Sequence, residues 1–293
     1  MQKATVIVCS FASITEDILD KYGVIALTPS LNWPEGEGLE GDNIFQKMRK
    51  AVEKGVNSTP KTSQPPMGAF KKAYDAALSK SENVIVITIS SKISGTYNAA
   101  IQTRKMFSEE MQKRIHIIDS NNIDAAESLL AIKACELAER GEEIQKIVET
   151  INNYVNKTYF FGMTENPNQM EAGGRISHTL AVILAQMQKI GLRPILHMKD
   201  GEVKPANLSI DAKDIAEALL KHFEEVTKKT LQEGKKYRVA ISHADNVEKA
   251  NELKYLLLNK FGDKIKVDFI SMTGPFIGAH VGPGTLMCAM LEE

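Results

Sequence analysis

The chain alternates short apolar runs with longer segments in which apolar residues recur every three or four positions. Residues 4–9, 84–89 and 114–119 are rich in β-branched side chains and have the length of strands buried on both faces. Helical patterns follow them, among them residues 125–140, which read as an amphipathic helix closed by Gly141. Strands that alternate with helices predict a mainly parallel sheet covered on both sides.

The pattern changes after about residue 155. Strand-like runs at 158–163, 192–198 and 202–208 follow, and the last two flank Asp200-Gly201, a strong hairpin signal. We therefore expect an α/β protein with two domains. Residues 1–158 would form a mainly parallel three-layer α/β/α domain, and residues 159–293 an α/β domain with a mixed or antiparallel sheet.

Local signals in the first half predict further elements. Ser13 and Glu16 have the spacing of a capping box, which predicts a helix that ends at Gly23. Residues 31–42 are polar, with proline and glycine, and indicate a loop. Thr62-Ser63 stands just before two prolines and a helical pattern, so a helix cap is its simplest interpretation.

Composition narrows the class of protein. Of the 293 residues, 43% are hydrophobic and 25% charged, and the net charge is −1, which argues against a nucleic-acid-binding protein. The three cysteines lie far apart and form no metal pattern, which favours free thiols in a reducing cytoplasm. No apolar run is long enough to span a membrane, and the first residues do not have the pattern of a signal peptide.

The clearest candidate chemistry follows the strand at residues 84–89. It leads into Ser94-Gly95-Thr96 and then into a helical pattern. Such a junction presents free backbone N–H groups and the positive end of a helix dipole, and ligands of open α/β sheets bind at these strand ends. The sequence thus predicts a binding site for a small anion.

Two other segments carry candidate residues. Residues 274–285 contain four glycines and two prolines around His280 directly after a strand, which predicts a rigid loop that approaches a ligand closely. Arg175 stands beside Gly173-Gly174, where it could bind an anion or tie the loop to the other domain. His243 also ends a strand and is a weaker candidate.

Common catalytic and nucleotide motifs are missing. Residues 36–41 match the dinucleotide pattern of glycines, but no strand precedes them and their acidic neighbours would repel a pyrophosphate. The sequence also has no phosphate-binding loop of the Walker type and no nucleophile elbow around a serine.

Five motifs in order resemble one family over nearly the whole chain. They are Thr62-Ser63-Gln64-Pro65, residues 91–97, residues 173–177, Arg193-Pro194-Ile195-Leu196 with Asp200-Gly201, and residues 277–284. Together they resemble the DegV family of fatty-acid-binding proteins, which carry the acyl chain for bacterial fatty acid kinase. The resemblance departs at Cys9, where the family usually has an aspartate.

The resemblance implies a fatty acid bound between two domains, with its tail in an apolar tunnel of the second domain. It implies that Thr62 and Ser94 hold the carboxylate, with His280 and Arg175 beside it. We include their neighbours Ser63, Gly95, Thr96 and Gly278 among the ligand-binding candidates. Seven methionines of the second half suit a tunnel for variable chains, although most of them individually fit an ordinary core.

Three functions remain open. The first is a non-catalytic carrier, which needs no cofactor or metal, acts as a cytoplasmic monomer and presents the carboxylate to a separate ATP-dependent kinase. The second is a lipid or ester hydrolase with Ser94 or Thr62 as nucleophile and His280 as base, which lacks a third orienting carboxylate. The third is a binder of nucleotides or sugar phosphates at the same helix N-terminus.

Overall fold

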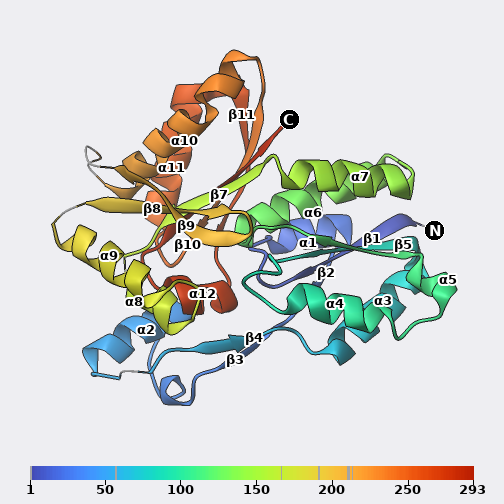
Figure 1. Ribbon diagram of the computed structural model, residues 1–293, viewed down its shortest axis with the longest axis horizontal. Helices are drawn as coiled ribbons and strands as arrows, with labels where there is room; N and C mark the ends of the chain where they lie inside the picture. Colours follow the sequence, from blue (N-terminus) through green and yellow to red (C-terminus); the bar gives the residue numbers. More distant parts are fainter. Residues whose placement is uncertain (1, 57, 166, 191, 210–211, 213) are drawn as a thin grey trace.

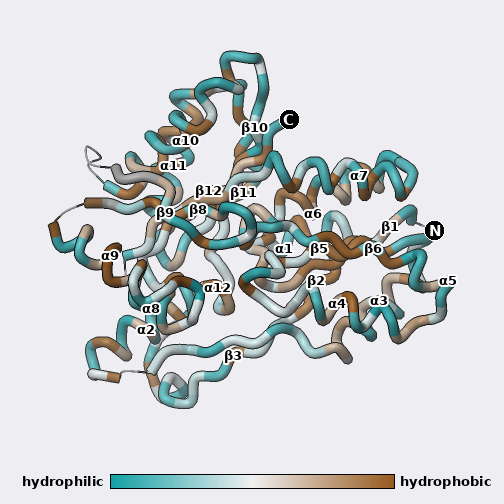
Figure 2. Tube along the Cα trace, viewed as in Figure 1, coloured by the Kyte–Doolittle hydropathy of each residue, from teal (hydrophilic) through white to brown (hydrophobic). Residues whose placement is uncertain are grey.

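Four parallel strands form the first sheet, in the order β2-β1-β5-β6. They are β2 (Ile25–Leu27), β1 (Gln2–Cys9), β5 (Ser81–Thr88) and β6 (Ile115–Asp119). The structure is a computed structural model and describes residues 2–56, 58–165, 167–190, 192–209, 212 and 214–293. Figure 2 shows the most hydrophobic part of the trace near β5 and β6, in the middle of the molecule.

Helices cover both faces of this sheet (Figure 1). On one face lie α3 (Met67–Lys80) and α4 (Thr96–Arg104), followed by the short α5 (Glu109–Gln112). On the other lie α6 (Asp124–Glu139) and α7 (Ile144–Val155), with α1 (Glu16–Tyr22) against α6. The predicted three-layer arrangement with a parallel sheet is confirmed.

The second sheet has six strands in the order β11-β10-β12-β7-β8-β9 and is mixed, because β10 and β11 are parallel and the other pairs antiparallel. Its strands are β7 (Thr158–Met163), β8 (Arg193–Lys199), β9 (Glu202–Ser209), β10 (Tyr237–His243), β11 (Ile265–Met272) and β12 (Leu286–Glu292). The predicted hairpin at Asp200-Gly201 joins β8 to β9. Helices α10 (Ile215–Gln232) and α11 (Val247–Phe261) cover the outer face.

Helix α6 lies between the two sheets, where it contacts β1 and β5 on one side and β7, β10 and β12 on the other. Almost every residue from Asp124 to Cys135 is therefore buried. The prediction of an amphipathic helix here was wrong, because a helix covered on both sides has no solvent face to keep polar.

The two faces of the second sheet belong to different cores. Phe160, Met198 and Met287 point to the inner face and pack with the core of the first sheet. Phe161 and Cys288 point to the outer face and pack against α10 and α11. This alternation follows from the two-residue period of strands.

A smaller layer closes one end of the gap between the sheets. It contains the two-stranded sheet of β3 (Ser30–Asn32) and β4 (Lys61–Ser63), the 3₁₀ turn η1 (Pro34–Gly36), α2 (Ile44–Glu53), α8 (Pro167–Ala172), α9 (His178–Lys189) and α12 (Pro275–Val281). Helix α12 contacts α2, β3, β4 and α8 (Figure 1). Its position brings the C-terminal half of the chain against the N-terminal half.

Four local predictions were wrong. Residues 31–42 are not all loop, since β3 and η1 occupy part of them, and residues 274–285 contain α12. Thr62 and Ser63 belong to β4, and Pro66 takes the N-cap position of α3. Ser13 caps no helix: α1 starts at Glu16 without a side-chain cap, and the Ser13 hydroxyl donates to Asp124 instead.

In the part of the chain that the structure describes, no helix is long enough and apolar enough to cross a membrane.

Candidate functional site

Thr62 and His280, 218 positions apart in the chain, meet between β4 and α12. Thr62 Oγ1 lies 2.7 Å from His280 Nε2. The ring is buried, and burial together with the nearby Arg175 guanidinium lowers the pKa of His280 to about 4. At neutral pH the imidazole is therefore uncharged.

The other ring nitrogen of His280 fixes the tautomer. Nδ1 is buried and has no hydrogen-bond partner among the described residues. Because an unpaired buried N–H group is rarer than an unpaired acceptor, we assign the proton to Nε2, which donates it to Thr62 Oγ1. The Thr62 hydroxyl proton is then free to point at a ligand. Gly173 lies so close to Nδ1 that a Cβ there would overlap it.

The loop after β5 brings a second hydroxyl to the same place. Ser94 Oγ lies 2.8 Å from Thr96 Oγ1 and accepts a hydrogen bond from the Thr96 backbone N–H at 3.3 Å. Ser94 is half-buried, and the N-cap position of α4 is taken by Gly95, which provides no side-chain cap. The Thr96 N–H is used by Ser94, whereas the next N–H groups of α4 have no side-chain cap and can face an anion together with the Ser94 hydroxyl.

Arg175 adds a positive charge. Its guanidinium is half-buried, donates to the Gly173 carbonyl, and pairs with no carboxylate in the described part of the chain. Burial lowers the pKa of this side chain from its ordinary value, although a guanidinium stays charged at neutral pH. A half-buried cation without a counter-ion favours an anionic ligand.

Three of these residues share one cavity. Ser94, Arg175 and His280 line a small cavity of about 40 Å³. A second cavity of about 30 Å³ adjoins it, since Ile123, Met170, Val203 and Val281 line both. The polar groups therefore lie in a cavity next to an apolar one.

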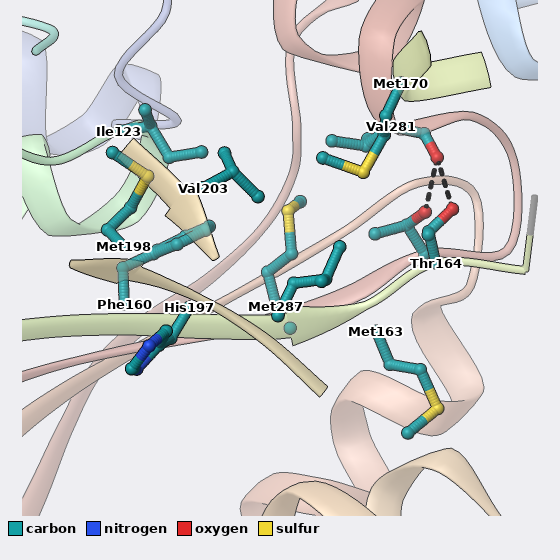
Figure 3. Close-up of a pocket in the computed structure, with 13 residues that line it drawn as sticks. Ile123, Phe160, Met163, Thr164, Met170, His197, Met198, Val203, Val281 and Met287 are labelled. Atoms are coloured by element: carbon teal, nitrogen blue, oxygen red, sulfur yellow. Dashed lines mark hydrogen bonds between the residues drawn. The ribbon is translucent and has the colours of Figure 1, made fainter. Parts of the chain in front are cut away.

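The second cavity is apolar (Figure 3). In the close-up, Ile123, Met198 and Val203 gather on one side of Met287, and Met170 and Val281 lie on the other. The hydroxyls of its two threonines both donate to the Val281 carbonyl, Thr164 at 2.7 Å and Thr285 at 2.9 Å. The wall thus offers hydrocarbon and thioether contacts to whatever enters, and its hydroxyl protons are already used.

The four remaining ligand-binding candidates do not line this cavity. Gly95 is exposed and lies against the Gln64 side chain, and Thr96 is buried behind Ser94. Ser63 is exposed on β4, and Gly278 packs against the Phe45 ring; neither lines the cavity. The structure thus brings Ser94, Arg175 and His280 to one cavity, and Thr62, which does not line it, contacts His280. His243 takes no part in this cavity, and its Nδ1 accepts the Asn246 N–H.

Sequence reasoning missed much of the apolar wall. Of the seven methionines, Met163, Met170, Met198 and Met287 line the second cavity, whereas Met272 is exposed and Met290 belongs to the outer core. Ile123, Val203 and Val281 were not expected there. The alternation along β7, β8 and β12 could have indicated which strand residues share the inner face, but only knowledge of strand order places α6 and α12 beside them.

The arrangement defines a binding site for an amphipathic anion. Hydroxyls, free helix N–H groups and a guanidinium surround one end, and aliphatic side chains surround the other. Of the two nucleophiles considered for a hydrolase, Ser94 is paired with Thr96 and only Thr62 is hydrogen-bonded to His280.

Comparison with known proteins agrees with a site for an amphipathic anion. The family described as "Uncharacterised protein, DegV family" matches residues 3–293. A curated protein of Thermotoga maritima named "Fatty acid-binding protein" is 31% identical and covers 97% of this chain and 96% of its own length. The chain belongs to the DegV family.

Solved structures share the fold. A DegV lipid-binding protein of Thermotoga maritima aligns with a TM-score of 0.76 and 27% identity over 99% of this chain and 98% of that protein. A DegV family protein of Thermus thermophilus, whose structure is described by its fatty acid binding, aligns with a TM-score of 0.84 and 23% identity over the full length of both chains.

Proposed function

We propose that this protein binds a long-chain fatty acid between two domains, residues 1–158 and 159–293. The carboxylate would lie at Thr62, Ser94 and Arg175, and the hydrocarbon tail would fill the apolar cavity. One observation carries the proposal: a half-buried guanidinium without a carboxylate partner among the described residues lines a cavity that adjoins an apolar one. The names of the relatives support the same ligand class.

The tail and the carboxylate of the fatty acid would contribute to binding in different ways. Each buried CH₂ contributes about 0.8 kcal/mol, so the tail supplies most of the affinity. The guanidinium and hydroxyls fix the orientation, with about 1.5–3 kcal/mol for a hydrogen bond to a charged group. His280 holds Thr62 in place without adding a charge of its own, because its pKa is lowered to about 4.

We further propose that the protein is a cytoplasmic, monomeric carrier that presents the carboxylate to an ATP-dependent kinase and needs no cofactor. The family resemblance supports the kinase. An open groove lined by Lys92, Arg175 and Lys204 lies directly outside the head-group end and gives a partner access to the carboxylate. The hydrolase hypothesis has less support. His280 is not hydrogen-bonded to Ser94, and its Nδ1 has no carboxylate partner to orient it for Thr62 in the described part of the chain.

The first test compares two ligands with one tail. We expect the protein to bind palmitate at least tenfold more tightly than methyl palmitate, since only the acid has a charge for Arg175. In Arg175→Met the affinity for palmitate should fall by about 1.5–3 kcal/mol, and the affinity for the ester should change little. Isothermal titration calorimetry measures both.

Lys105→Met is the matched control, because it removes an exposed positive charge at the far end of α4. It should leave both affinities unchanged. If palmitate does not bind the wild-type protein, or if Arg175→Met weakens acid and ester equally, the proposed function is wrong.

A further inference from the structure

Ser90 makes an unusual number of hydrogen bonds at the point where β5 ends. Its backbone N–H donates to the Asn122 carbonyl at 2.9 Å. Its carbonyl accepts from the N–H groups of Ile93 and Ser94, each at 3.2 Å. The backbone of Ser90 therefore fixes the turn that carries the Ser94 hydroxyl.

The side chain of Ser90 reaches the other half of the molecule. Its Oγ donates to the Gly201 carbonyl at 2.7 Å and accepts the Lys92 N–H at 3.3 Å. Ser90 is fully buried, so this bond is shielded from water. The tip of the β8–β9 hairpin is thus attached to the loop after β5.

The fit at the hairpin tip is close. Gly201 is buried and has φ of +78°, a conformation that favours glycine. A Cβ on Gly201 would lie 2.7 Å from Ser90 Oγ and 3.4 Å from Asn121 Oδ1. Any larger residue at this position would push the hairpin tip away from Ser90.

Each side of this contact carries part of the cavity. The loop carries Ser94, at the polar end. The hairpin carries Met198 and Val203, which are paired across its strands and line the apolar part. The Ser90–Gly201 bond is therefore a short link between the two ends of the cavity.

We propose that Ser90 is a positioning residue that sets the Ser94 hydroxyl against the tail-binding hairpin, so that a bound tail and the carboxylate contact are energetically coupled. The inference rests on the proposed function and deepens it. Ser90 itself does not line the cavity and touches no ligand.

A double-mutant cycle tests the coupling, with palmitate affinity as the readout. Ser94→Ala is expected to weaken binding about tenfold and Ser90→Ala about fivefold. In a Ser94→Ala background, Ser90→Ala should cost less than twofold, because the hydroxyl that it positions is gone. Ser91→Ala, an exposed neighbour in the same loop, serves as control and should change affinity less than twofold in both backgrounds.

Gly201→Ala probes the contact from the other side and should show the same loss of effect in the Ser94→Ala background. Methyl palmitate separates positioning from general damage, since Ser90→Ala should change its affinity less than twofold. Additive effects of Ser90→Ala and Ser94→Ala on palmitate, or an equal loss with the ester, would overturn the coupling and leave the proposed function intact. A Ser94→Ala variant that binds palmitate normally would overturn the head-group assignment and the coupling with it.

Discussion

Two carboxyl groups are buried where β1, α6 and the end of β10 meet. Asp124 accepts hydrogen bonds from Ser13, from Ser242 at 2.5 Å and from Thr273 at 3.2 Å. Burial nevertheless raises the pKa of Asp124 to about 6, with the hydroxyls lowering it only in part. Burial also raises the pKa of Glu127 well above its ordinary value, and the Cys9 backbone N–H, which faces this carboxyl group, lowers it only in part.

The two carboxyl groups stabilise the folded protein in mild acid. The folded state binds the Asp124 proton more tightly than the unfolded chain, in which an aspartate titrates near ~3.9. This contribution is therefore fully present below about pH 4 and is lost as pH rises through about 6, which amounts to roughly 2–3 kcal/mol. The lowered pKa of His280 has the opposite effect on stability, so the Asp124 contribution is the difference between the wild type and Asp124→Asn. Urea denaturation at pH 5 and pH 8 measures it, and about 1.4 kcal/mol of the Asp124 contribution falls in this interval.

Asp124→Asn should remove the Asp124 part of that dependence, because an amide does not titrate. Asp263→Asn, at a side chain 90% exposed, is the control and should keep the full dependence. An Asp124→Asn variant whose stability still falls as steeply between pH 5 and pH 8 would contradict the assignment.

The contacts of these single residues could not be predicted from the sequence. The departure at Cys9 was visible, but the partner that faces its backbone N–H, Glu127, belongs to a helix that appeared amphipathic. Ser13 had the spacing of a helix cap, yet its hydroxyl found a stronger acceptor in Asp124. Such choices depend on which groups the fold brings together, and a local pattern does not contain that information.

Among the elements, those with strong local signals were predictable. Strands β1 and β5 are apolar runs of β-branched residues, and the hairpin has Asp-Gly at its turn. Strands β3 and β4 have only three residues each, and they exist because they pair with each other. The seven-residue α12 lies between glycines, with Pro275 in its first turn, so its composition resembled a loop.

The contact of α12 with α2 gives a prediction about the site. A Cβ on Gly278 would lie 2.5 Å from Cζ of Phe45, a ring that is almost fully buried. Gly278→Ala should therefore push α12 away from α2 and move His280 relative to Thr62. We expect a loss of about 1–3 kcal/mol in unfolding free energy, together with weaker palmitate binding.

Phe45→Leu in the same chain provides the matching test, because a smaller side chain leaves room for the added methyl group. The double variant should recover part of the lost stability and affinity. If Gly278→Ala alone is as stable as the wild type, the close contact between α12 and α2 does not exist in solution.

At the scale of the whole molecule, α6 joins the two sheets into one structure. Its contacts with both sheets are hydrophobic along most of its length, and a charged group adds a specific connection. Arg238 on β10 donates to Glu136 on α6 at 2.8 Å and to Asp268 on β11 at 2.5 Å. The side chains of Arg238 and Asp268 are each only 5% exposed. The prediction of two sheets from sequence could not include this connection, since it requires their relative orientation.

Removal of Arg238 should therefore cost far more than removal of a surface charge. Arg238→Met leaves Asp268 buried with Lys266 as its remaining ion-pair partner in the described residues, and we expect a loss of about 3 kcal/mol in unfolding free energy. Adding Asp268→Leu removes the unpaired buried charge and should restore most of that stability.

Lys133→Met is the matched control, because it breaks the more exposed pair between α6 and Glu293 and should cost less than about 1 kcal/mol. Guanidinium denaturation of the wild type and the three variants measures these changes in unfolding free energy. Equal losses for Arg238→Met and Lys133→Met would mean that apolar packing of α6 alone holds the sheets together.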